Sequence, residues 1–356
     1  MPIHRVYRLW LERLTQLHPD FHARCLSNFA WLLAGLYLSQ SVHLSSIARK
    51  LPGKTQLGSW VQRLRRLLMN PRLRVRDWYC PVATLLLERA AQSGRLRLLV
   101  DGTKVGFHHQ LLIVSLAYRR RALPIAWTWV RGGRGHSSAR KQLALLRYVH
   151  SLVPSHASVS LVGDSEFGAV ALLRQLDAWG WLYSLRQKGD RLVQIEPGTW
   201  QRFDSLVSQP GQSVWKPEAS FTQAHGYPTR LLAHWTPGEK EPWLLTTNFS
   251  TPELTRRAYQ RRMGIEEMFG DLKKHGVDLE ATHLRHFQRL SRLTLAVALL
   301  YVWMVALGSS IIKTGQRAWV DRKHRRDLSI FRIGFYSLER RLANQAKLLL
   351  RLVPYF

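Results

Sequence analysis

Apolar residues recur at helical spacing through the first 90 residues of the chain. The stretch "LSNFAWLLAGLYLSQ" predicts one apolar helix. The next stretch, "HLSSIARKLPGKTQLGSWVQRLRRLLMN", predicts two more helices that are separated at a Pro-Gly break, and the second of them is basic. This order is compatible with a helix-turn-helix, although any small helical bundle has the same pattern. Residues 1–90 are therefore expected to form a helical domain.

The pattern changes to short apolar runs after residue 90. Runs such as "RLRLLVDGTKVG" and "QLLIVSLAYRRRALPIAWTWV" predict strands, and the whole region has the order β-β-β-α-β-α-β. This order is typical of a mixed sheet covered by helices. Residues 187–242 are rich in turn-forming residues between short β-like segments, so we expect a β-rich insertion there, followed by one more strand in "PWLLTTN".

A long helix is expected to begin at residues 250–253, "STPE". Ser250 is the expected N-cap, Pro252 lies in the first turn, and Glu253 completes a capping box. With Gly276 as the expected stop, the helix has about 25 residues.

The stretch "LTLAVALLYVWMVALGSSII", Leu293 to Ile312, is nearly long enough to span a bilayer. Three small residues, Gly308-Ser309-Ser310, interrupt it, and a helix that is buried on all sides has the same composition. We therefore expect a buried helix and no membrane association. Residues 311–356 predict a basic helical tail.

The chain carries a formal charge of +30, from 53 Lys and Arg residues against 23 Asp and Glu residues. A field of this strength attracts polyanions, and phosphate neutralisation dominates the binding of nucleic acids. We therefore favour nucleic acid as the partner over a ribosome-associated role or an anionic membrane surface. Because of its basic helix, the domain over residues 1–90 is interpreted as a DNA-binding domain rather than a plain packing module.

The cysteines and the N-terminus indicate a cytoplasmic protein. Cys25 and Cys80 are the only cysteines, and the sequence has no Cys-x-x-Cys pair or Cys/His cluster, which argues against zinc. Two isolated cysteines fit a reducing compartment. The first residues, "MPIHRVYRLWLERL", are charged throughout and lack the apolar core of a signal peptide.

Three acidic residues are candidates for chemistry in this basic chain. Asp101 and Asp164 each end a predicted strand, where a carboxylate points into a cleft or serves as a turn or cap residue. On a helical projection Glu266 lies within about 60° of Tyr259, Arg262 and Lys273, whereas the adjacent Glu267 points away. A salt-bridged surface has the same spacing, so this stripe leaves both interpretations open.

Three neighbouring carboxylates repel one another unless cations lie between them. Mg²⁺ takes carboxylate oxygens and leaves room for phosphate and water, and two such ions about 4 Å apart promote phosphodiester cleavage. An acidic metal site in a basic protein is thus the arrangement expected for cutting or joining nucleic acid.

The residues Tyr259-x2-Arg262-x3-Glu266-x6-Lys273 match the Y-x2-R-x3-E-x6-K signature of DDE transposases of the insertion-sequence-four family. With Asp101 and Asp164 in the positions of the two aspartates, residues 90–300 resemble this family. The resemblance implies an α/β fold whose centre is a ribonuclease-H-like mixed-sheet catalytic core over residues 91–310. The β-rich insertion at 187–242 lies within that core, and the N-terminal helical domain and the C-terminal helical region over residues 311–356 flank it.

The resemblance also implies roles for individual residues. Asp101, Asp164 and Glu266 would bind two Mg²⁺ ions, with Mn²⁺ as a substitute, and Tyr259, Arg262 and Lys273 would hold the transposon end. Trp243 would stack on a base flipped out of that end, unless it is a core tryptophan. Arg186 would contact a DNA phosphate, unless it is simply a solvated basic residue.

Several further residues near the acids in sequence are left outside this set. We interpret Glu166 as a residue of a surface turn. The histidines His108, His109 and His136 are interpreted as structural or phosphate-contacting residues.

The function implied is that of a bacterial transposase, cytoplasmic and associated with the nucleoid. It would bind the terminal inverted repeats of its element as a homodimer on the paired ends. It would then excise the element through nicking and hairpin formation and join the 3′-hydroxyl ends to double-stranded target DNA. The alternatives are a ribonuclease-H-like nuclease or resolvase without strand transfer, and a domesticated, non-catalytic DNA-binding protein.

Overall fold

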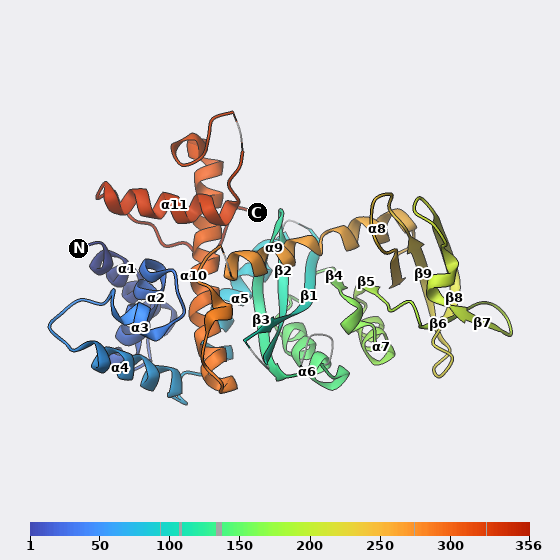
Figure 1. Cartoon of the computed structure of the whole chain (residues 1–356), viewed down its shortest axis with the longest axis horizontal. Coiled ribbons are helices and arrows are strands. Elements are labelled where there is room, and N and C mark those ends of the chain that lie inside the picture. Colours follow the sequence, from blue (N-terminus) through green and yellow to red (C-terminus); the bar gives the residue numbers. More distant parts are fainter. Residues whose placement is uncertain (93, 107–108, 133–136, 274, 325) are drawn as a thin grey trace. The chain divides into compact units, whose positions relative to one another are not determined.

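The computed structural model describes the whole chain except residues 93, 107–108, 133–136, 274 and 325 (Figure 1). The chain divides into two compact units. The helical unit comprises Met1–Arg89, Val105–His109 and Met268–Phe356, and the sheet unit comprises Ala90–Lys104 and Gln110–Glu267. Residues after Met268 thus group with the N-terminal helices, while divisions at residues 90 and 310 remain expectations from the sequence.

The sheet unit is built on ten strands in one mixed sheet (Figure 1). They are β1 (Leu96–Val105), β2 (His109–Tyr118), β3 (Arg121–Arg131), β4 (Val159–Gly163), β5 (Leu182–Arg186), β6 (Leu192–Glu196), β7 (Thr199–Arg202), β8 (Ser213–Phe221), β9 (Tyr227–His234) and β10 (Trp243–Thr247). The spatial order is β3-β2-β1-β4-β5-β10-β9-β8-β6-β7. The strands β1, β4 and β5 are parallel, and β10 is antiparallel to both of its neighbours.

Helices cover the central strands of the sheet. They are α6 (Ala139–His150), α7 (Val170–Ala178), α8 (Pro252–Gln260) and α9 (Met263–Leu272), with short 3₁₀ turns η1 (Ser165–Phe167) and η2 (Phe203–Leu206). Figure 1 shows α6 and α7 on one side of these strands and α8 on the other. The expected mixed α/β fold with flanking helices is confirmed. The β-rich insertion, however, extends the central sheet through β9 and β10 rather than standing apart from it.

The helical unit contains the remaining helices. They are α1 (Pro2–Leu17), α2 (Ala23–Ser39), α3 (Leu44–Ala48), α4 (Leu57–Met69), α5 (Val75–Gln92), which runs on into the sheet unit, η3 (Leu279–Ala281), α10 (Phe287–Lys313), η4 (Gln316–Trp319) and α11 (Ile330–Ala343). The apolar helix α10 is the core of this unit. Among the described helices it alone is long and apolar enough to cross a membrane, and 89% of its most apolar stretch is buried inside the protein. It is therefore the expected buried helix.

Aromatic rings and one buried cation tie α10 to its neighbours. Trp303 lies edge-on to Trp10 of α1, with 5.3 Å between the ring centroids. The buried guanidinium of Arg292 donates to the carbonyl oxygens of Leu68 (2.8 Å) and Leu73 (3.0 Å). Carbonyls at a helix C-terminus lack partners within their own helix, so Arg292 satisfies the end of α4.

In the described part of the tail beyond α10, the helical elements are η4 and α11. Gln345 has a φ of 51°, in the left-handed region that ends helices. The amide of Ala346 then donates back to the carbonyl of Arg341 (2.9 Å), and the chain from Asn344 onward contains no helix. This local closure explains why the basic, leucine-rich end of the sequence does not continue as a helix.

Two glycines allow α10 and α11 to cross in direct backbone contact. A β-carbon at Gly308 would overlap the carbonyl oxygen of Ile330, and one at Gly334 would overlap the carbonyl oxygen of Met304. The clashing atoms are backbone atoms of rigid helices, so the crossing cannot relax by a change of rotamer.

The replacement Gly334→Ala should therefore lower the free energy of unfolding by about 2–3 kcal/mol, since the two helices must separate. A fall in the thermal midpoint would report it. The matched control is Gly58→Ala in α4, where an added β-carbon meets nothing within 4 Å. It should be neutral or stabilise by up to about 1 kcal/mol. Equal midpoints for the two variants would contradict the tight crossing.

Candidate functional site

The parallel pairing of β1 and β4 brings two of the predicted acids to adjacent strands. Val100 pairs with Gly163, and each of these residues is followed by an aspartate, Asp101 or Asp164. The Asp101 side chain is 3% exposed and accepts a hydrogen bond from the amide of Gly102 (2.7 Å). The Asp164 side chain accepts from the amide of Ser165 and caps η1.

The expectation that a strand ends at Asp101 is wrong. The strand β1 continues to Val105, whereas β4 stops at Gly163. Strand β1 has a second neighbour, β2. Asp101 is consequently held inside a strand at the point where one of its neighbours ends, and only Asp164 follows the end of its strand.

The expected continuous helix over residues 250–276 is also wrong. It is two helices, α8 and α9, with a turn at Arg261 and Arg262. A β-carbon at Gly264 would lie 2.9 Å from the carbonyl oxygen of Arg121 on β3, so glycine lets the start of α9 approach that strand. This close approach fixes Glu266, two residues later.

The start of α8 is displaced by one residue from its expected position. Thr251, not Ser250, is the N-cap, and its hydroxyl accepts from the amide of Leu254 (3.3 Å). Glu253 is therefore the second residue of the helix, and the expected capping box with Ser250 does not form.

Arg262, in the turn between α8 and α9, bridges two of the three predicted acids. Its guanidinium pairs with Asp101 at 3.0 Å and with Glu266. The Arg262 side chain is 14% exposed and that of Glu266 is 38% exposed, so the pair with Asp101 is the more buried. Removing one partner from a buried pair costs about 3–5 kcal/mol, because the other charge is left uncompensated.

Asp164, the third predicted acid, also acts on the guanidinium of Arg262. Burial lowers the pKa of Arg262, but the neighbouring Tyr259 and three carboxylates outweigh burial and raise it. The three carboxylates are Asp101, Glu266 and Asp164. The structure thus gathers all three predicted acids in the electrostatic field of one arginine.

Tyr259 lies beside Arg262 and is buried, with its ring 5.9 Å from the guanidinium carbon. Burial raises the pKa of its hydroxyl, Arg262 and Arg186 oppose that rise, and the two aspartates add to it. The hydroxyl has no hydrogen-bond partner among the described residues. A buried hydroxyl without a partner costs about 1–3 kcal/mol.

Trp243 and Arg186 border the same region. The ring of Trp243 lies edge-on to Tyr259 at 5.0 Å and is only partly buried. Arg186 pairs with Glu241 (2.9 Å) and donates to the carbonyl oxygen of Pro242 (3.2 Å). Arg186 is therefore held in place and is not a freely solvated side chain.

Two further predicted positions differ in their surroundings. Lys273 belongs to the helical unit, where it pairs with Glu280 at 2.5 Å. Glu267, which points away from the acids on the helical projection, pairs with Arg121 at 2.8 Å. This ion pair agrees with the helical projection, on which Glu267 points away from Tyr259, Arg262 and Glu266.

Glu166 is a residue that sequence reasoning placed wrongly. It does not lie in a plain surface turn, because its carboxylate accepts from the side chain of Gln110 (2.7 Å) and from the amide and hydroxyl of Ser137 (amide 3.0 Å). The buried Gln142 of α6 donates to the Glu166 carbonyl (2.9 Å). These bonds tie the segment after Asp164 to β2 and α6.

The signal for this network in the sequence is weak. Gln110 is fully buried at the start of the apolar run "QLLIVSL", and a buried amide requires a partner. Nothing in the spacing indicates that the partner lies 56 residues later.

Of the three predicted histidines, His108 and His136 lie outside the described residues. His109 contacts the carbonyl oxygen of Arg285 through Nε2 (3.0 Å) and lies edge-on to Phe287 at 5.5 Å. Both partners belong to the helical unit, so its described contacts are structural.

The three acids offer carboxylate oxygens, which divalent cations bind, but Arg262 already pairs with Asp101 and Glu266. Within the described residues no group of three or more His, Cys, Asp or Glu side chains forms a metal site. Carboxylate oxygens are the ligands that Mg²⁺ takes. The guanidinium supplies the positive charge that a cation would bring, so binding a cation requires Arg262 to release the carboxylates.

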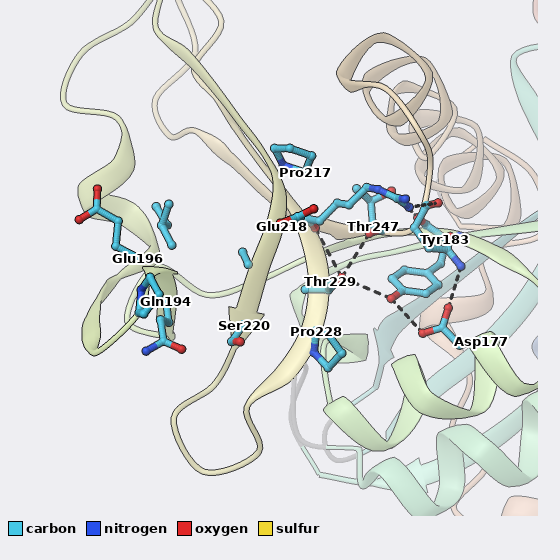
Figure 2. Close-up of a pocket in the computed structure, with 15 residues that line it drawn as sticks. Asp177, Tyr183, Gln194, Glu196, Pro217, Glu218, Ser220, Pro228, Thr229 and Thr247 are labelled. Atoms are coloured by element: carbon cyan, nitrogen blue, oxygen red, sulfur yellow. Dashed lines mark hydrogen bonds between the residues drawn. The ribbon is translucent and has the colours of Figure 1, made fainter.

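A separate pocket of about 610 Å³ lies among β5, β6, β8, β9 and β10 (Figure 2). None of the predicted site residues lines it. Asp177 on its wall accepts from Asn248 (2.8 Å) and from the hydroxyls of Tyr183 (3.4 Å) and Tyr227. Burial, with Asp177 nearby, raises the pKa of Tyr183 to about 12. These hydrogen bonds join α7 to the sheet, which gives Asp177 a structural role.

The fold and the acids define a protein of the DDE transposase class. The chain belongs to the family of the transposase DDE domain, whose model matches residues 92–303, more than half of the chain. The matched segment contains Asp101, Asp164 and Glu266.

Other comparisons are more distant. A piggyBac transposase synaptic complex with hairpin DNA, solved by cryo-EM, is similar with a TM-score of 0.44 and 11% identity. The alignment covers 96% of this chain and 78% of that chain. At this level the likeness adds nothing to the family match. No curated protein matches the chain significantly.

The replacement Glu166→Ala should lower the free energy of unfolding by about 2–4 kcal/mol, because three donors, one on Gln110 and two on Ser137, lose their acceptor. Glu166→Gln keeps one acceptor oxygen, so its free energy of unfolding should lie between that of Glu166→Ala and that of the wild type. The matched control is Glu218→Ala, an exposed glutamate on β8, with an expected effect within about 0.5 kcal/mol. Thermal midpoints would check this, and a Glu166→Ala midpoint equal to that of Glu218→Ala would contradict the network.

Proposed function

We propose that this DDE transposase is of the insertion-sequence-four type and that it excises and inserts its own DNA element. The observation that carries the proposal is the cluster around Arg262. Arg262 lies far from the two aspartates in sequence, yet it pairs with Asp101 and with Glu266, and Tyr259 lies beside it. A signature match without function would not require this convergence.

Asp101, Asp164 and Glu266 are proposed to hold two Mg²⁺ ions, or Mn²⁺ in their place. When bound, the ions supply charge stabilisation and lower the pKa of the attacking water or hydroxyl. With that charge supplied, the Arg262 guanidinium would be free to contact the phosphate of the transposon end. The Tyr259 hydroxyl, which has no protein partner among the described residues, donates to the same backbone.

The reaction proposed has three phosphoryl transfers at each end and a fourth in the target. Water first cuts one strand and leaves a 3′-hydroxyl. This hydroxyl attacks the opposite strand, which forms a hairpin and releases the flanking DNA. Water opens the hairpin, and the restored 3′-hydroxyl attacks the target DNA. Trp243 would stack on a base that leaves the duplex when the hairpin forms. Two ends must be paired, so we expect a homodimer on DNA, in the bacterial cytoplasm.

Glu266→Gln should abolish nicking, with a loss of at least about 100-fold, because one metal ligand is removed. The substrate is a labelled duplex carrying the inverted repeat that flanks the reading frame, with Mg²⁺ and gel analysis of the products. Glu267→Gln is the matched control on the same helix and should cut normally. Both variants should bind the duplex in a gel shift. Normal cutting by Glu266→Gln together with failure of Glu267→Gln would reject the assignment.

The products also separate the alternatives. Nicks without any joined product would identify a nuclease or resolvase without strand transfer. Binding without cutting by the wild-type protein would identify a non-catalytic DNA-binding protein.

Trp243→Ala should nick at near-normal rate and form about 10-fold less hairpin, since base stacking contributes about 1–3 kcal/mol per base. The matched control is Trp200→Ala, a partly buried tryptophan on β7 that should change neither step. Unchanged hairpin yield in Trp243→Ala would show that this ring is a packing residue only.

A further inference from the structure

A small pocket lined by arginines lies in the sheet unit, between α8 and strands β1 and β4. Its volume is about 210 Å³. Leu99 of β1 and Val162 of β4 form its floor, and Leu254 and Ala258 of α8 contribute its apolar side. Four exposed arginines line this space: Arg95, Arg97, Arg257 and Arg261. No acidic residue lines it.

These arginines differ from the others near the acids in having no carboxylate partner. Arg262, Arg186 and Arg121 each pair with an acid. In the described part of the chain, none of the four pocket arginines forms an ion pair, and Arg95 donates only to the hydroxyl of Ser158 (3.1 Å).

Three of the four charges also act on one another. Burial lowers the pKa of Arg97, and the neighbouring Arg261 and Arg95 lower it further. Like charges that converge on a concave surface repel, and an anion in the pocket would relieve that repulsion.

The pocket is linked to the acids along two elements. Alternate residues of a strand share one face, so Arg97 and Leu99 lie on the same face of β1 as Asp101. Asp101 comes four positions after Arg97 along β1, which corresponds to about 13 Å in a strand. On the helical side, Arg261 directly precedes Arg262.

We propose that this arginine pocket binds a backbone phosphate of the DNA, as an anchor apart from the catalytic acids. The proposal rests on the function proposed above. A separation of about 13 Å corresponds to about four nucleotides of duplex, at 3.4 Å per nucleotide along each strand. The volume is below the roughly 300 Å³ at which small-molecule sites begin, which favours a single phosphate of a longer chain over a free nucleotide. Such a contact fixes the position of DNA without reading its sequence.

The salt dependence of DNA binding tests this proposal. The probe is a fluorescent duplex of about 30 base pairs with arbitrary sequence, and its affinity is measured by anisotropy over a series of KCl concentrations without divalent cations. For Arg97→Ala and for Arg261→Ala, the slope of log K against log [KCl] should become shallower by about 0.9, the value for one phosphate. Because both side chains serve the same phosphate, the double variant should lose no more than either single variant.

The control is matched in charge. Arg147→Ala removes one positive charge from α6 of the same unit, where the side chain contacts only Gln175 (3.3 Å) among the described residues. Its slope should equal that of the wild type, and Arg97→Lys should keep most of the wild-type slope. Equal slopes for Arg97→Ala and Arg147→Ala would overturn the proposal, as would additive losses in the double variant.

Titration calorimetry with inorganic phosphate separates the two sources of the same chemical group. We expect no saturable binding of free phosphate with a dissociation constant below about 1 mM, which corresponds to a binding free energy of about −4 kcal/mol. Saturable binding that is lost in Arg97→Ala, together with an unchanged DNA slope, would show a site for a free phosphate and overturn the DNA assignment. Since these measurements need no cleavage, their outcome is independent of the Glu266→Gln result, and the two proposals fail separately.

Discussion

The pairing of Arg262 with Asp101 is the interaction around which the site is arranged. Asp101 lies inside a strand with almost no solvent exposure, and a carboxylate in that position needs a positive charge or a set of donors. The turn between α8 and α9 brings Arg262 within reach. In a continuous helix that residue would instead follow the straight helix axis. The ion pair with the buried Asp101 therefore depends on the break between α8 and α9. Glu266 and Tyr259 take their positions from the same turn.

Much of the fold is visible in the sequence, because local patterns decide it. The two apolar runs in "QLLIVSLAYRRRALPIAWTWV" predict β2 and β3, and the apolar character of residues 293–312 predicts the buried part of α10. The site residues were found through the spacing of a signature, together with two aspartates at or near strand ends. Their convergence around Arg262 agrees with that spacing, although the projection assumed a single helix.

The remaining features depend on contacts between distant segments. The break before α9 lies where Gly264 approaches the backbone of β3. A single glycine in a helical pattern does not predict such a contact. The continuation of β1 beyond Asp101 depends on the length of its neighbour β2. The network of Glu166 joins residues from β2, α6 and η1, so no single stretch of sequence contains it. Each of these is decided by packing, which overrides the local preference.

The hydroxyl of Tyr259 gives the proposed function a consequence for stability. It is buried without a partner in the described structure, and phenylalanine at that position would remove the cost of leaving it unsatisfied. If this hydroxyl donates to the DNA as proposed, the free energy lost in the free protein would be recovered on binding, and the affinity would rise by the same amount.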